Sequence, residues 1–343
     1  MRVGLVGYFG AGAYSDDLIE HVTKQLFLDV NPDITFDSTI LRRGPAGSDP
    51  DYLNSFDLLV HCGGSLLGKC THFPVRNIAM WADKVETPLA VFGVGYRYEP
   101  DKEPLTPAMK ERIRLLFDKS EVISVRGKYT VKHLEENSID TSRIDHLGDP
   151  VMACTPKLKR SSRYLMGNVR HMPTEEIQHN STEQVQRYMA ECYDWLIDRH
   201  SQPLVLVSFR HNIASDNDVT GAQNVKEHMD HSDNVTIATP PSYLEALNLM
   251  EDASFYYGQR LHPTIYAATQ GIPFVGVEYQ FDKMLDWTST VGTNNTVHTA
   301  SATLTDFTDA YRRVGSNMRH LKAVLPRRAT EIRDIAKRIV ELV

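Results

Sequence analysis

Short apolar runs alternate along the chain with longer amphipathic stretches. The apolar runs are continuous, which is typical of strands buried on both faces, and a glycine or polar turn follows each of them. They lie at residues 3–6, 34–36, 58–61, 89–92, 122–125, 204–207, 235–237, 255–257 and 274–277. The stretches that we expect to be helices lie at residues 16–28, 74–84, 107–118, 128–137, 182–199, 242–250 and 263–270. This repeated strand–helix order predicts an α/β fold with parallel sheets.

The pattern lapses at residues 155–162, a polar stretch with one proline and no apolar period. We place a domain boundary there, because a chain of 343 residues exceeds the roughly 250–300 that one core supports. The predicted domains span residues 1–156 and 163–343, and the second ends in a basic helix. The expected architecture is two Rossmann-like domains whose parallel sheets face a cleft, with ligands at the carboxyl ends of the strands.

The composition is that of an ordinary globular protein, with 41% hydrophobic and 24% charged residues. No run approaches the roughly 20 apolar residues that span a bilayer, and no signal-peptide core follows Met1. We therefore expect a soluble, cytoplasmic protein. The four cysteines are widely spaced without a CxxC pair, which predicts reduced thiols. There is no HExxH motif or spaced carboxylate cluster, so we expect no metal.

The net charge of −7 is unevenly distributed. Residues 311–343 hold nine Lys or Arg against three acids, so this segment carries +6 and the remainder −13. The basic segment could contact an anionic membrane surface, or it could be a solvated helix face packed on its own acidic body. The acidic balance of the whole chain argues against a nucleic-acid partner.

Three glycine-rich loops follow strands of the first half. The first, residues 7–17, contains Gly10 and Gly12, which allow close backbone approach to a ligand, and then Asp16 and Asp17. Asp16 can cap the following helix, and both acids could bind sugar hydroxyls. Ser15 stands where a dinucleotide fingerprint needs glycine, which makes a nicotinamide cofactor a weak hypothesis.

The second glycine-rich loop contains Gly63 and Gly64, and the third runs from Gly93 through Gly95 to Tyr96. Any one of these loops alone is more often a tight turn. Together, at one edge of a sheet, they predict backbone contact with a ligand.

Two charged residues stand at element ends later in the first half. Arg126 lies between a predicted strand and a helix N-terminus, a setting that suits anion binding, although pairing with a structural carboxylate is equally consistent with the sequence. Asp149 precedes Pro150, and this rigid pair either holds the carboxylate toward the cleft or forms only a turn.

In the second half, Arg210 follows one predicted strand, and the segment from Arg260 through Leu261 and His262 to Pro263 follows another. Pro263 suits the first helical position, which would place Arg260 and His262 where the helix dipole favours an anion. A lone histidine there is more often structural, but the neighbouring arginines favour a functional site.

The order of these motifs resembles the polysaccharide pyruvyl transferase family over nearly the whole chain. The matching residues are the glycine-rich first loop with Asp16, then Gly63-Gly64, Gly93-Val94-Gly95, Ser124-Val125-Arg126 through Leu134, Gly148-Asp149-Pro150, Arg260-Leu261-His262, Ala267-Ala268, Gly271-Ile272-Pro273 and Tyr279 with Lys283. Two positions depart from the family pattern. Ala13-Tyr14-Ser15-Asp16-Asp17 replaces the usual Asn-x-Gly-Asp-Glu, and Gly127 replaces the acidic residue usual after Arg126.

The resemblance implies transfer of a pyruvyl group from phosphoenolpyruvate to a sugar or glycan precursor as a cyclic ketal, with release of phosphate and no further cofactor. It also implies a fold like the two-domain glycosyltransferases (GT-B-like). The family's donor site maps onto Arg126, Arg260, Leu261 and His262. A lipid-linked acceptor would suit the basic C-terminal segment.

The residue types agree with this chemistry. Cations bind the carboxylate and phosphate of the donor, and we expect Arg210 or Lys283 to assist Arg126 and Arg260. The predicted catalytic acid is His262, with Asp16 or Asp149 as the base for the sugar hydroxyls. The predicted acceptor-binding residues are Gly10, Gly12, Asp17, Gly63, Gly64 and Tyr96. We therefore expect the first domain, residues 1–156, to be the acceptor side and the second, residues 163–343, to be the donor side.

Two other hypotheses fit the sequence. A GT-B-type glycosyltransferase that uses a nucleotide-sugar would have the same architecture, since fold does not decide function. A non-catalytic glycan-binding homologue would explain the altered first loop, although the intact Arg260 and His262 argue against it.

Overall fold

The computed structural model describes most of the chain. The described residues are 1–68, 84–97, 105–145, 148–156, 162–171, 181–210, 217–279, 282–298 and 302–343. The helix expected at residues 74–84 therefore lies almost wholly outside them.

The first sheet contains six parallel strands drawn from the N-terminal half. They are β1 (Arg2–Val6), β2 (Thr35–Asp37), β3 (Leu58–Cys62), β5 (Leu89–Val94), β7 (Ser120–Val125) and β8 (Ile144–Asp145), in the order β2-β1-β3-β5-β7-β8. The strand order reverses between β1 and β3, and such a switch point is where open parallel sheets bind ligands. Two short strands, β4 (Leu67–Gly68) and β6 (Tyr96–Arg97), pair with each other beside this sheet.

The second sheet is also parallel and six-stranded. Its strands are β9 (Tyr164–Asn168), β10 (Leu204–Val207), β11 (Val235–Ala238), β12 (Ala253–Gly258), β13 (Phe274–Glu278) and β14 (Thr296–His298), in the order β11-β10-β9-β12-β13-β14. This is the dinucleotide-fold order, with its switch point between β9 and β12. Arg260 lies in the short loop after β12, and His262 lies in the first turn of the helix that follows.

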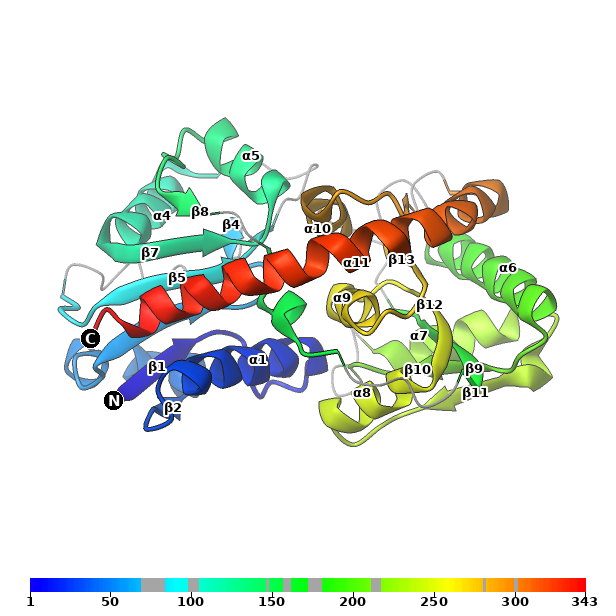
Figure 1. Ribbon diagram of the computed structural model, residues 1–343, viewed down its shortest axis with the longest axis horizontal. Coiled ribbons are helices and arrows are strands. Elements are labelled where there is room, and N and C mark those ends of the chain that lie inside the picture. Colours follow the sequence, from blue (N-terminus) through cyan, green and yellow to red (C-terminus); the bar gives the residue numbers. More distant parts are fainter. Residues whose placement is uncertain are drawn as a thin grey trace.

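Helices cover the sheets on both sides (Figure 1). They are α1 (Tyr14–Val30), α2 (Pro50–Leu53), α4 (Pro107–Lys119), α5 (Lys128–Glu136), α6 (Thr182–His200), α7 (Asp218–Glu227), α8 (Tyr243–Glu251), α9 (Leu261–Thr269), α10 (Lys283–Val291) and α11 (Leu304–Val340), with 3-10 turns η1 (Ile40–Ser48), η2 (Pro150–Ala153) and η4 (Ser232–Asn234). Two Rossmann-like units with parallel sheets confirm the predicted fold class.

The longest helix, α11, joins the two halves of the molecule. It contacts α6, β13 and β14 of the second half, and then η2, α1 and β7 of the first. Figure 1 shows it crossing from one sheet to the other, so that the C-terminus lies near the N-terminus. The predicted division at residues 156–163 stays a prediction, and α11 belongs to both halves by its contacts.

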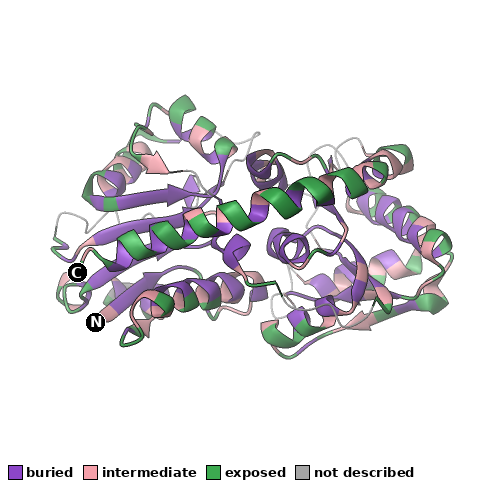
Figure 2. Cartoon of the chain, viewed as in Figure 1, coloured by how far each residue is buried: buried purple, intermediate pink, exposed green. Residues whose placement is uncertain are grey.

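Burial follows the apolar pattern of the sequence. The central strands of both sheets are mostly buried and the edge strands are partly exposed, whereas α11 exposes one continuous face (Figure 2). The carboxyl-terminal loops of the two sheets meet directly: the Tyr14 amide donates to the Phe209 carbonyl at 3.1 Å, and the Tyr14 hydroxyl donates to the Pro240 carbonyl at 2.8 Å. Within the part of the chain described, no helix is long and apolar enough to cross a membrane.

Candidate functional site

Arg126 lies in a tight setting at the first sheet's edge, between β7 and α5, as its sequence position predicts. Its guanidinium is 2% exposed. Nε donates to Asp149 Oδ2 at 3.0 Å, and Nη1 donates to Ser65 Oγ at 3.1 Å. A Cβ on Gly95 would lie 2.9 Å from Nη1, so glycine is needed for this approach. Nη2 has no hydrogen-bond partner among the described residues, although it is buried.

Asp149 joins the two domains. One oxygen, Oδ2, receives Arg126 Nε and lies 3.2 Å from His262 Nε2 of the second domain, while Oδ1 accepts from the Val151 amide at 3.0 Å. Burial alone would raise the pKa of Asp149, but the charge and hydrogen bond of His262, with Arg126, hold it at about 2. The carboxylate is therefore ionised and both oxygens are engaged. This geometry does not support the predicted role of Asp149 as a base for a sugar hydroxyl.

His262 and Leu261 open α9, and both are buried. The sequence predicted Pro263 at the first position of this helix. The helix begins at Leu261, so Pro263 occupies the third position instead. A proline is tolerated there because amides of the first turn lack an intrahelical acceptor. Arg260, the N-cap residue, makes a two-pronged ion pair with buried Asp218, with Nη2 to Oδ1 at 2.6 Å and Nε to Oδ1 at 3.2 Å.

Asp16 lies inside the first turn of α1, which begins at Tyr14. The prediction that Asp16 caps this helix is wrong. The N-cap residue is Ala13, which makes no side-chain capping bond. Burial raises the pKa of Asp16, against the lowering effect of the nearby charges of His262, Arg210 and Lys283. The Asp16 carboxylate thus lies within electrostatic reach of the second domain's cations.

Lys283, at the start of α10, lies in a cluster of positive charge. Burial lowers its pKa to about 7, helped by the charges of Arg170, Arg97 and Arg126, while Glu278 opposes the shift. The Arg170 guanidinium also lies 5.3 Å from the centre of the Tyr279 ring. Two domains thus bring several cations together around Arg126, which favours a multiply charged anion.

The predicted acceptor residues do not all lie beside the charged cluster. A Cβ on Gly64 would lie 3.7 Å from Asp16 Oδ1, so Gly64 borders the charged cluster. Asp17 binds its own loop, with Oδ1 accepting from the Gly10 amide at 2.8 Å. The Tyr96 ring packs against His133 at 5.4 Å. Gly10, Gly12 and Gly63 have positive φ angles that other residues rarely adopt, and Gly10 and Gly63 face Arg42 and Ile19 rather than the cluster.

Several residues of this cluster were not predicted. Ser65 holds Arg126, and Asp218 holds Arg260. Asp218 also accepts from Asn168 Nδ2 and the Phe209 amide, each at 2.9 Å. Ser65 directly follows Gly64, so the loop itself could have indicated it. No local sequence signal connects Asp218 to Arg260.

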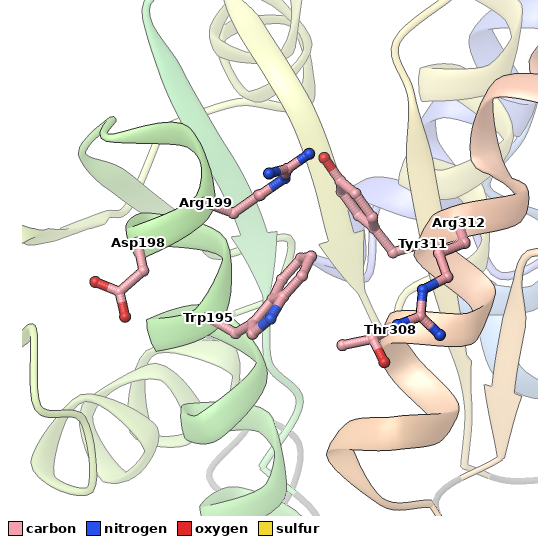
Figure 3. Close-up of a pocket in the computed structure, with 6 residues that line it drawn as sticks. All are labelled: Trp195, Asp198, Arg199, Thr308, Tyr311 and Arg312. Atoms are coloured by element: carbon pink, nitrogen blue, oxygen red, sulfur yellow. The ribbon is translucent and has the colours of Figure 1, made fainter.

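A separate groove of about 500 Å³ lies between α6 and α11 (Figure 3). Its lining residues are Trp195, Asp198, Arg199, Thr308, Tyr311 and Arg312. None of the predicted site residues lines it.

The candidate site is therefore the interdomain cluster around Arg126, Asp149 and His262. Among the described residues, no group of three or more His, Cys, Asp or Glu side chains could hold a metal ion.

Comparison with known families agrees with the motifs. The family model for polysaccharide pyruvyl transferases matches residues 16–280. The chain belongs to this family. The match spans the first-loop aspartates and every motif up to Tyr279, and it makes this pyruvyl transferase homologue a transferase of polysaccharide biosynthesis. No curated protein sequence matches the chain.

Solved structures show what the fold is similar to. HepE from Anabaena in complex with UDP-glucose has a TM-score of 0.60 at 8% identity, covering 100% of this chain and 99% of that one. UDP-GlcNAc 2-epimerase from Neisseria meningitidis, bound to UDP-GlcNAc, has a TM-score of 0.58 at 13% identity, covering 100% and 99%. The S. aureus MnaA–UDP structure has a TM-score of 0.55 at 12% identity, covering 93% and 89%. At these identities the likeness concerns the fold alone and confirms the GT-B-like architecture.

Proposed function

We propose that this pyruvyl transferase homologue transfers the pyruvyl group of phosphoenolpyruvate onto two hydroxyls of a sugar, forming a cyclic ketal and releasing phosphate. Family membership supports pyruvyl transfer to a glycan. The observation that carries the choice of donor is Arg126, whose buried Nη2 has no partner among the described residues and whose charge, with those of Arg97 and Arg170, acts on Lys283. Phosphoenolpyruvate supplies a carboxylate and a phosphate that such a cluster can bind.

The donor-binding residues divide between the domains. Arg126 Nη2 is available to a donor oxygen, since its other nitrogens are held by Asp149 and Ser65. Lys283 and Arg210 approach from the second domain. Arg260 and Leu261 complete the set at the start of α9, where the helix dipole also favours an anion. Cations in this position stabilise the charge that develops on the departing phosphate.

The reaction balances as follows. One sugar hydroxyl adds to C2 of the donor while a proton goes to C3, which becomes the methyl group. The C2–O bond to phosphate then breaks, the second hydroxyl oxygen bonds to C2, and its proton leaves with phosphate or solvent. Two hydroxyl protons are thus accounted for, one in the methyl group and one in the products. The step needs a proton donor near C3 and a base near the hydroxyls.

We assign the proton donor to His262 and the base to Asp16. Because His262 Nε2 faces Asp149, its other ring nitrogen, Nδ1, is the one that exchanges a proton with the donor. Asp149 orients this ring, as the carboxylate does in hydrolase triads. Asp16 lies on the acceptor-side domain beside Gly64, and burial raises its pKa. A raised pKa brings a carboxylate closer to the working pH and makes it a stronger base.

A nucleotide-sugar glycosyltransferase is the second candidate, because the similar solved structures contain UDP or UDP-sugars. Thermal unfolding with millimolar phosphoenolpyruvate beside a panel of nucleoside diphosphates distinguishes the two. A ligand at about 100 times its dissociation constant adds roughly 2.7 kcal/mol to the native state. We expect a shift with phosphoenolpyruvate. A rise in the unfolding temperature with a nucleoside diphosphate alone would contradict pyruvyl transfer and favour glycosyl transfer.

A lipid-linked acceptor is part of the proposal. Arg312, Arg319, Lys322, Arg333 and Lys337 are exposed and recur at helical spacings along one face of α11, which we name the basic face. Local pairs such as Arg312 with Asp309 neutralise only part of it. A row of cations on the outside of both domains fits an anionic membrane surface, at which a cytoplasmic enzyme would meet a lipid-linked glycan.

A further inference from the structure

The helix that follows Arg126 begins without a cap from its own domain. The N-cap of α5 is Gly127, which has no side chain to accept a hydrogen bond. Asp286 of α10, in the second domain, supplies the acceptor. Its Oδ1 accepts from the amide of Tyr129 at 2.8 Å and of Thr130 at 3.4 Å, and its Oδ2 accepts from the Thr130 hydroxyl at 2.7 Å. A carboxylate at a helix N-terminus satisfies otherwise unpaired amides and opposes the dipole.

The same face of α10 contacts α5 on the neighbouring turns. Thr290, one turn after Asp286, accepts from the Lys128 amide at 3.1 Å. Asp282, one turn before, has Oδ2 3.5 Å from His133 Nε2. The three residues stand at i, i+4 and i+8, which places them on one helix face. Figure 1 shows α5 and α10 on the facing sides of the two domains.

Gly127 is the residue that permits this contact. A Cβ there would lie 2.3 Å from Asp286 Oδ1, 2.3 Å from Thr290 Oγ1 and 2.8 Å from the Asp286 carbonyl oxygen. Such distances leave no room for any side chain. The position directly after Arg126 must therefore be glycine for α10 to pack this closely against it.

A second path leads from Asp286 to the Arg126 side chain. The Thr130 hydroxyl, which donates to Asp286, also accepts from the Tyr96 amide at 3.1 Å. Tyr96 follows Gly95, against which the Arg126 guanidinium lies. Asp286 thus fixes both the backbone just after Arg126 and the loop that supports its guanidinium.

We propose that Asp286 is a positioning residue for Arg126, so that the donor-binding arginine of the first domain is held in place by a helix of the second. This inference rests on the proposed role of Arg126 in donor binding. It makes donor affinity depend on the contact between α5 and α10, although Asp286 itself does not touch the donor.

The test compares the dissociation constant of phosphoenolpyruvate in Asp286→Ala, Asp286→Asn and wild-type protein by calorimetry. We expect at least tenfold weaker binding in Asp286→Ala. The loss in Asp286→Asn should be smaller, because the amide oxygen still accepts from Tyr129, and this variant also serves if the alanine variant does not fold. The matched control is Thr106→Ala, which removes the side-chain cap of α4 in the same domain and should leave affinity unchanged.

Hydrogen exchange without ligand gives a second readout. Asp286→Ala should speed exchange at the amides of Tyr129, Thr130 and Tyr96, and Thr106→Ala should not. Wild-type affinity in Asp286→Ala, or unchanged exchange at these amides, overturns the proposal. If wild-type protein does not bind phosphoenolpyruvate at all, the proposed function fails, while exchange at Tyr96 still decides whether Asp286 holds the loop under Arg126.

Discussion

Lys283 gives the donor site a pH dependence whose sign follows from its surroundings. Burial and three arginines lower its pKa to about 7 in the free protein. The proposed role of Lys283 in donor binding requires the charged amine, so above about pH 7 binding would first have to take up a proton. We expect affinity for phosphoenolpyruvate to fall as pH rises from 7 to 9, by up to about tenfold per pH unit. Calorimetry at pH 8 in buffers of different ionisation enthalpy should show this proton uptake.

The control for this prediction is Lys283→Arg, which keeps a fixed charge at the same place. It should bind the donor without proton uptake at pH 8. Equal proton uptake in both proteins would assign the titration to another group.

Arg260 combines a proposed binding role with a structural one. Its ion pair with Asp218 is buried on both sides, so Arg260→Ala leaves the buried carboxylate without its counter-ion and should destabilise the protein by about 3–5 kcal/mol in urea unfolding. Adding Asp218→Asn should recover part of that stability but not the affinity for phosphoenolpyruvate. If affinity returns together with stability, Arg260 is a structural residue and the donor site lies with Arg126 alone.

At the residue scale, the sequence predicted where charged residues lie along the strands and helices better than it predicted which residues they pair with. Arg126, Arg260 and His262 were found because each stands between a strand end and a helix start, which is a local pattern. The sequence left open whether Arg126 binds an anionic ligand or pairs with a structural carboxylate. The structure shows Asp149 on one nitrogen, and another nitrogen has no partner among the described residues. The pairing of Arg260 with Asp218 spans 42 positions of the chain, and no local pattern encodes it.

At the scale of elements, the end of β5 must pass close to the turn that carries Asp149. Gly93 has a φ of +64°, and a Cβ on it would lie 2.3 Å from Pro150 Cδ. Gly93→Ala should therefore destabilise the protein by about 2–4 kcal/mol, from the strained backbone and the clash together. It should also weaken donor binding, since Pro150 holds Asp149. Urea unfolding and calorimetry measure the two effects.

Gly271→Ala is the matched control. Gly271 has a similar φ of +71° but no atom within 4 Å of its added Cβ, so only the backbone cost of about 1–2 kcal/mol applies. An equal loss of unfolding free energy in the two variants would show that the clash with Pro150 contributes nothing to the destabilisation of Gly93→Ala.

The elements that the sequence missed share a physical cause. The central strand β9 contains Met166, Gly167 and Asn168 rather than a run of branched residues, so its burial comes from neighbouring strands and not from its own propensity. Helix α10 is short, and its first amides donate to Glu278 of the preceding strand rather than to the side chain of its own N-cap residue, Asp282. The missing acidic residue after Arg126 has a structural counterpart in Asp286 of α10, which only the assembled domains reveal.

For the whole molecule, the alternation of apolar runs and amphipathic stretches was sufficient to predict two parallel sheets, because each strand–helix unit buries its own surface. The return of α11 onto the first half could not be predicted in this way. Its apolar residues repeat at helical spacing throughout, and burial against the first domain or the second leaves the same pattern. Which residues face outward is visible only in the assembled fold, and membrane contact through the basic segment stays a prediction.

The five side chains of the basic face of α11 are exposed, and one of them, Arg333, also donates from Nη2 to the Ala153 carbonyl at 3.2 Å. We expect the protein to cosediment with phosphatidylglycerol-containing vesicles but not with neutral ones, and less so at high salt, since the screening length falls from about 10 Å at 0.1 M to 3 Å at 1 M. Neutralising Arg319, Lys322 and Lys337 to Gln should weaken binding on the order of 100-fold, at about 1 kcal/mol per residue. Neutralising Lys132, Arg163 and Arg187, which are exposed on other elements, should change little. Equal losses in both triple variants would mean that net charge, and not this face, attracts the membrane.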